Sequence, residues 1–136
     1  MPAIEVQHFL GRARDFLDGM KLLSDDLTEY RYSSALLAIH SAISYCDALR
    51  SGLGGVKLSL DNHLSAVGEL RTLLADRKYD KPQGADRLER LLSKKSKIAY
   101  AADEATKNEI DDIVLQAERF ALWAEEVGEK LKIEGW

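Results

Sequence analysis

Residues 33–49, which read SSALLAIHSAISYCDAL, decide the fold class of this chain. Apolar side chains recur here at every third or fourth position, a spacing that places them on one face of an α-helix. That face consists of Leu36, Ile39, Ala42, Ile43, Cys46 and Leu49. Ser33 or Ser34 is expected to cap the helix, because a hydroxyl there accepts hydrogen bonds from free backbone N–H groups. The stretch therefore predicts an amphipathic helix that turns one face to a core.

The same periodicity continues on both sides of this helix. Further helices are expected at residues 4–23, from Asp61 or Asn62 to Leu74, at residues 85–105, and from Thr106 or Asn108 to Leu131. Residues 24–26 (SDD), 51–55 (SGLGG) and 80–84 (DKPQG) separate them, since glycine and proline end helices readily. No stretch shows the period-two pattern of a strand. Residues 1–136 thus predict one all-α domain, an up-and-down bundle of about five helices.

Composition narrows the class of protein further. The chain has 136 residues and a net charge of -4, which suits one core and gives no global basic field for nucleic acid or membranes. Only a local basic patch could serve such binding. The single cysteine, Cys46, fits a reducing compartment, and its apolar setting favours a core side chain over a reactive thiol. No apolar run approaches the roughly 18–20 residues that span a bilayer, and no secretory signal begins the chain. A cytoplasmic protein without membrane association is expected.

No recognisable cofactor or metal motif occurs in the sequence. Gly52, Gly54 and Gly55 lack the lysine spacing of a phosphate-binding loop. There is neither a cysteine pair nor an HExxH segment for zinc. The sequence predicts no cofactor and no metal site.

His40, Ser44 and Asp47 form the first polar feature. Their spacings of four and three residues place them along one line of the helix surface, beside the apolar face. A carboxylate orients an imidazole and raises its pKa, as general acid–base chemistry requires. The alternative, which the sequence favours, is a polar flank at the edge of the core.

Asp61, Asn62 and His63 form the second feature, just before the third helix. Capping by Asp61 or Asn62 explains it without any function. A functional interpretation brings His63 close to Asp47 at the mouth of the bundle.

Lys95 is the third feature, because it lies on the apolar face of its predicted helix. The other members of that face are Leu88, Leu91, Leu92, Ile98 and Ala102. A lysine there either extends its ammonium into water or meets a buried carboxylate, for which Asp47 is the candidate. Both readings remain open.

Residues 34–43 (SALLAIHSAI) and 47–49 (DAL) resemble the second helix of bacterial HEPN domains, small helical bundles named for a proposed nucleotide-binding role. The resemblance continues through residues 61–63 (DNH), Lys95-Ser96 with Tyr100, and residues 116–120 (QAERF), and covers most of the chain. It implies a homodimer and, in many family members, a nucleotidyltransferase partner in a toxin–antitoxin pair. Leu37 and Tyr45, apolar residues beyond the main stripe, also favour a homodimer.

Many HEPN domains carry a metal-independent ribonuclease motif of arginine, a polar residue and a histidine. This chain resembles the motif in spacing, with Lys95, Ser96 and Tyr100 at the three positions. Lysine offers phosphate a point charge where arginine offers a rigid fork. Tyrosine is a poor base at pH 7, because phenols lose their proton near pH 10. The resemblance therefore implies a binding cleft more than a cleavage site.

The function predicted is a non-catalytic or weakly catalytic module that binds a nucleotide, RNA or a partner protein. Its expected ligand-binding residues are Asp47, His63, Lys95, Ser96 and Tyr100. Asp47, His63, Lys95 and Tyr100 are expected to converge in one cleft. The alternatives are a ribonuclease toxin, with catalytic candidates Lys95, Tyr100, His63 and His40, and a structural dimerisation bundle.

Overall fold

The computed structural model describes residues 2–25, 27–55, 63–100 and 104–136 of the chain. Within these ranges the backbone forms five helices and no strand. They are α1 (Pro2–Ser24), α2 (Leu27–Gly52), α3 (His63–Asp76), α4 (Gly84–Ala99) and α5 (Lys107–Lys130). The predicted all-α bundle is confirmed. None of the described helices combines the length and the apolar character needed to cross a membrane.

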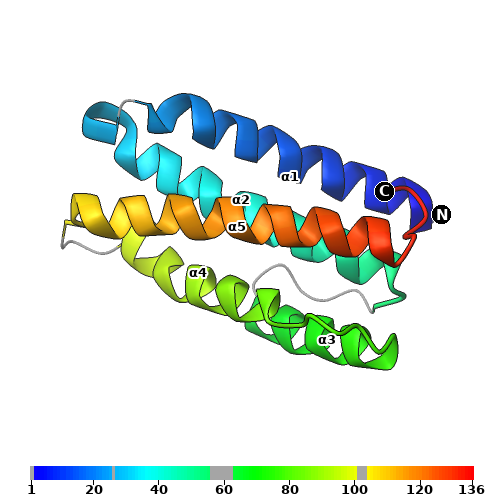
Figure 1. The fold of residues 1–136 in the computed structure, drawn as a ribbon. Coiled ribbons are helices and arrows are strands. Elements are labelled where there is room, and N and C mark those ends of the chain that lie inside the picture. The colour runs from blue at the N-terminus through cyan, green and yellow to red at the C-terminus, as the bar shows by residue number, and fades with distance from the viewer. Residues whose placement is uncertain (1, 26, 56–62, 101–103) are drawn as a thin grey trace.

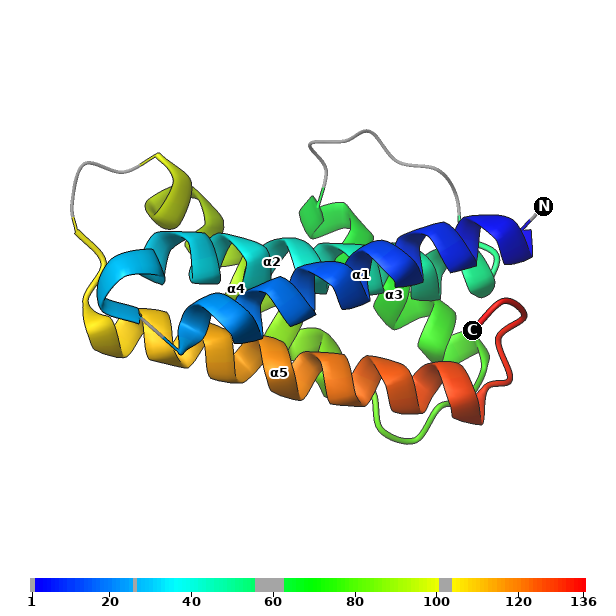
Figure 2. The ribbon, with the colours of Figure 1, turned by 90° about the horizontal axis from the view of Figure 1, so that it is seen from above.

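Helix α2 is the centre of the bundle and contacts each of the other four helices. Figures 1 and 2 show α1 and α5 as its long neighbours, while α3 and α4 lie on the side of the bundle away from α1. Small side chains let these neighbours approach α2 closely. The buried alanines of α2 are Ala35, Ala38, Ala42 and Ala48. Because α2 is covered on most sides, nearly all of its second half is buried.

The start of α2 differs from the prediction. The helix begins at Leu27, and Ser34 lies inside it, fully buried, so the expected cap at Ser33 or Ser34 is wrong. A kink at Tyr30, with φ -117° and ψ 24°, marks the point where the regular helix resumes. The chain is thus helical again from Leu27, soon after α1 ends at Ser24, and it changes direction at the kink.

The start of α5 follows the local sequence closely. Thr106 is the N-cap, its side chain accepts from the backbone N–H of Glu109, and the two residues form a capping box. Of the two predicted starts, Thr106 is thus the correct one. Helix α4 ends at Ala99, so the predicted extension to residue 105 is wrong, and Ala102 lies outside the described residues.

Two predicted positions of apolar side chains are also wrong. Leu64 belongs to the apolar repeat of the predicted third helix, which places it on the core side, but it is 65% exposed, because the buried face of α3 is Ala66, Val67, Leu70 and Leu74. Tyr45 was expected on an outer surface available to a second copy. Its ring is buried within the bundle, and its hydroxyl donates to Glu125 at 2.8 Å. Leu37 is partly buried and packs against the core. Tyr45 therefore gives the predicted homodimer no support.

Candidate functional site

Lys95 and His63 meet between α4 and α3. The Lys95 Nζ lies 3.5 Å from the Nε2 of His63, which sits in the first turn of α3. The ammonium donates to this nitrogen when the imidazole proton is on Nδ1. Lys95 is half-buried, as expected for a residue beside the apolar face of α4. Of the four residues expected to converge, these two lie within hydrogen-bonding distance.

Asp47 pairs with a residue that the sequence interpretation missed. Its carboxylate lies 3.1 Å from the Nη1 of Arg50, one turn further along α2, and the predicted ion pair with Lys95 does not form. The Nε of the same arginine lies 3.1 Å from Glu69 of α3. Arg50 is buried, and its planar guanidinium reaches both acids at once, which a lysine ammonium does less well. Burial raises the pKa of Asp47, and the nearby positive charges of Arg50 and His63 only partly oppose this.

His40 lies on α2 facing the same region. Its ring packs against Phe16 of α1, with ring centroids 6.0 Å apart. Burial lowers the pKa of His40, and the positive charges of Lys95 and His63 lower it further. The three basic groups therefore act on one another electrostatically. Ser44, on the same line of the helix, is buried and packs among the helices, which agrees with the polar-flank reading.

Tyr100 does not join this cluster. It is 83% exposed at the C-cap of α4, and Ser96 is exposed as well. Five residues along a helix correspond to a rotation of about 140°, so Lys95 and Tyr100 point to different sides. The prediction that Tyr100 converges with Asp47, His63 and Lys95 is wrong for this chain taken alone.

The space beside Asp47 and His63 is too small for a ligand. Side chains of α2, α3 and α4 leave about 10 Å³ there, no more than one water molecule needs. Cys46 is fully buried in this wall, and burial raises the pKa of its thiol, which favours its predicted core role. The described side chains around this space therefore enclose no room for more than one water molecule.

The outer surface is basic along α4. The helix carries five basic and two acidic residues, and Arg87, Arg90 and Lys94 follow one another at spacings of three and four. The two acids, Asp86 and Glu89, both bind Arg71 of α3 on the other flank of α4. We call Arg87, Arg90 and Lys94 the basic face of α4. Within the described part of the chain, no carboxylate forms an ion pair with them. Their helical spacing was visible in the sequence, but their lack of acidic partners was not.

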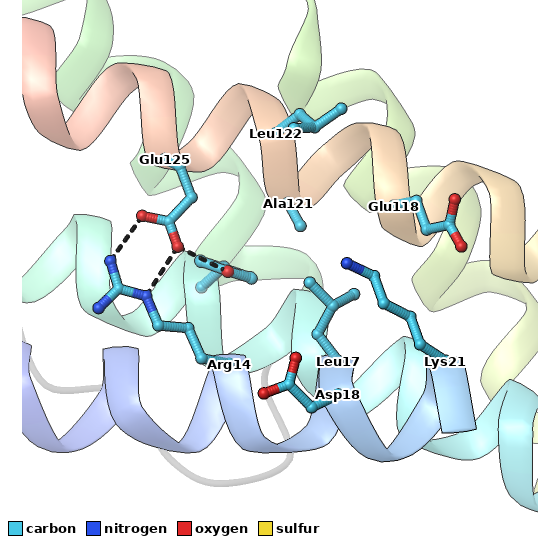
Figure 3. Close-up of a pocket in the computed structure, with 9 residues that line it drawn as sticks. Arg14, Leu17, Asp18, Lys21, Glu118, Ala121, Leu122 and Glu125 are labelled. Carbon is cyan, nitrogen blue, oxygen red and sulfur yellow. Dashed lines mark hydrogen bonds and ion pairs between the residues drawn. The ribbon is translucent and has the colours of Figure 1, made fainter. Parts of the chain in front are cut away.

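A second site lies between α1 and α5, on Glu125 (Figure 3). The carboxylate accepts two hydrogen bonds from Arg14, of 2.8 and 2.7 Å, and one from the Tyr45 hydroxyl. The indole of Trp136 donates a fourth at 3.0 Å. Burial raises the pKa of Glu125, but the hydrogen bonds from Arg14 and Tyr45 outweigh it, so this pKa is lowered. Sequence reasoning missed this network, because its members come from distant segments.

In the ranges that the structure describes, no group of three or more His, Cys, Asp or Glu side chains could hold a metal ion. No family model, characterised protein or solved structure matches this chain. The resemblance to HEPN domains stays a prediction.

Proposed function

We propose that this protein is a non-catalytic, HEPN-like module that binds single-stranded RNA across the basic face of α4. One observation carries the proposal: Arg87, Arg90 and Lys94 lie in a line without carboxylate partners among the described residues, in a protein of net charge -4. An acidic protein that leaves a basic line uncompensated presents a local field for a polyanion.

The dimensions of the basic face suit a nucleic-acid backbone. Lys94 follows Arg87 by seven positions, which corresponds to about 10 Å along the helix. Arginine and lysine at such positions neutralise phosphates and release counterions. Tyr100, 83% exposed at the end of the same helix, offers a ring on which a base can stack. Ser96 and Lys95 lie between Lys94 and Tyr100 in the sequence, but they point to other sides of the helix.

Binding should depend on the basic face more than on total charge. Replacing Arg87, Arg90 and Lys94 together by alanine should weaken binding of a 20-nucleotide single-stranded RNA about 30-fold, if each exposed phosphate contact contributes about 0.7 kcal/mol. The salt dependence, plotted as log K against log salt, should become shallower by about two units, since each phosphate contributes about 0.7. Fluorescence anisotropy over a salt series measures both quantities.

The matched control is a triple alanine variant of Arg12, Arg77 and Lys132, which removes the same charge elsewhere on the surface. It should retain most of the affinity. Equal losses in the two triple variants would mean that only total charge matters, and the basic face would then have no special role. Light scattering of the complex would also give the number of protein copies bound.

RNA cleavage is expected to be absent or very weak. Loss of general-base assistance alone costs about 100- to 10,000-fold in rate, and a tyrosine at the motif's histidine position supplies little such assistance. The measurement is incubation of single-stranded RNA with protein and excess EDTA, beside a Tyr100→His variant. Strong wild-type cleavage that Lys95→Ala abolishes would contradict the proposal and restore the ribonuclease alternative. Cleavage by Tyr100→His alone would identify a ribonuclease scaffold that lacks its base.

A further inference from the structure

Carboxylates and leucines form a line along the outer side of α5. They recur at alternating spacings of four and three residues, which places them on one stripe of a helix. The members of the line are Asp111, Leu115, Glu118, Leu122, Glu125 and Glu129. Leu115 and Leu122 are 41% and 74% exposed, so the line faces solvent. We call these six residues the acidic line of α5.

Most of the carboxylates in the acidic line lack a cation. Glu125 is bound by Arg14 in the double hydrogen bond described above. Within the part of the chain that the structure describes, no cation forms an ion pair with Asp111, Glu118 or Glu129. The line therefore combines exposed apolar side chains with uncompensated negative charge. A surface that is both cationic and partly aliphatic would complement it.

The basic face of α4 is a surface of that kind. Arg87, Arg90 and Lys94 follow one another at the same spacings of three and four residues, and they too lack ion-pair partners among the described residues. Arginine and lysine lay their aliphatic stems on apolar surface while their charged ends stay outside it. Stems from the basic face can thus cover Leu115 and Leu122 while the charged ends reach the carboxylates between them.

A single chain cannot bring these two surfaces together. The acidic line lies on the α1 side of α5, because Glu125 binds Arg14 of α1 (Figure 3). Helix α5 packs on α4 through another side, where the ring of Trp123 covers Gly84. Helices α1 and α4 lie on opposite sides of α5 (Figure 1). Only a second copy of the chain can therefore place a basic face on the acidic line.

We propose that the acidic line of one copy docks on the basic face of α4 of another copy. Because the two surfaces differ and every copy carries both, the contact is head-to-tail and adds further copies instead of stopping at a two-fold dimer. The carboxylates of the line take the place of RNA phosphates on the basic face, so self-association and RNA binding exclude one another. This competition rests on the proposed function, whereas the association itself does not.

Sedimentation equilibrium of the full chain measures the association without RNA. The average mass should rise with protein concentration at about 0.01 M salt and stop rising at about 1 M salt, since the screening length falls from about 30 Å to about 3 Å. Glu118→Lys and Arg90→Glu should each abolish the rise, because each places like charges opposite one another. An equimolar mixture of these two variants should associate again, because each surface of one variant meets its complement on the other.

The matched controls are Asp76→Lys and Arg77→Glu, which make the same charge changes near the end of α3 and should associate as the wild type does. Leu122→Ser leaves the charge unchanged and should weaken the association about tenfold, since it removes most of an apolar contact. A mass independent of protein concentration would overturn the proposal. So would a mixture of Glu118→Lys and Arg90→Glu that associates no more than its components, or control variants that lose the association equally.

Adding the single-stranded RNA of the binding experiment to the wild type tests the competition. The RNA should bind and reduce the association of the protein. Association that persists while RNA is bound would overturn the shared use of the basic face. RNA that fails to bind, with the mixture of variants still associating, would contradict the proposed function alone.

Discussion

Replacing Arg50 with methionine should lower the free energy of unfolding by about 3 kcal/mol. Arg50 is buried and lies 3.1 Å from both Asp47 and Glu69, whose side chains are only 29% and 19% exposed. Removing one member of a buried ion pair leaves charge without compensation and costs about 3–5 kcal/mol. The two acids retain some contact with water, so the lower end of that range is expected. Urea unfolding followed by circular dichroism measures the change.

Arg71 provides the matched control for Arg50. It too binds two acids, Asp86 and Glu89, but its side chain is 38% exposed and theirs are more so. Exposed ion pairs contribute about 0–1 kcal/mol, so Arg71→Met should have a small effect. Similar losses in the two variants would show that burial does not distinguish these networks, and would contradict the role assigned to Arg50.

Replacing Gly84 with alanine should also destabilise the protein by about 3 kcal/mol. A Cβ at Gly84 would overlap the ring of Trp123, which is buried and cannot move without disturbing the core. The indole N–H donates to the carbonyl of Lys81 at 2.7 Å, and a shifted ring loses that bond. Overpacking costs about 1–3 kcal/mol and a lost hydrogen bond about 1 kcal/mol. Thermal and urea unfolding measure the change in stability, and Trp fluorescence reports a change in the environment of the Trp123 ring.

Gly68 is the control for this steric argument. It lies in α3 and is exposed, and, apart from its own helix backbone and chain neighbours, no heavy atom of the described residues lies within 4 Å of the position that a Cβ would take. Alanine is a better helix former than glycine, so Gly68→Ala should stabilise the protein by about 0.5–1 kcal/mol. The same substitution is thus expected to lower the stability at Gly84 and to raise it at Gly68. A stabilised Gly84→Ala variant would show that Trp123 has room that the structure does not give it.

Much of the fold could be predicted from local signals. The apolar period of three to four residues located all five helices, and Thr106, one of the two predicted starts of the fifth, is its N-cap. The predictions were wrong where packing against a neighbouring helix decides whether a residue is buried or exposed. Ser34 has the chemistry of a cap, yet α2 continues through it, because packing buries this side chain. Leu64 is apolar but 65% exposed, because none of the described helices covers its side of α3.

In the candidate site, too, some features followed from the sequence and others only from tertiary packing. Sequence spacing and the resemblance to HEPN domains singled out Lys95 and His63, each as a neighbour of Asp47, and the structure brings the two to 3.5 Å from one another. The sequence could not show which cation pairs with Asp47, because two were within reach. Arg50 lies one turn along the same helix, α2, and Lys95 lies on α4. In the structure Asp47 pairs with Arg50, whose guanidinium binds carboxylates of both α2 and α3.

The sequence by itself determined the helices, their ends near glycine and proline, and the basic spacing along α4, because these depend on residues close together in the chain. Only the tertiary structure decided which charges are compensated. Arg71 engages the two acids of α4, and Glu125 joins α1, α2 and the C-terminal Trp136. Electrostatic partners are set by distances of a few ångströms between segments far apart in sequence. Periodicity along one helix carries no information about those distances.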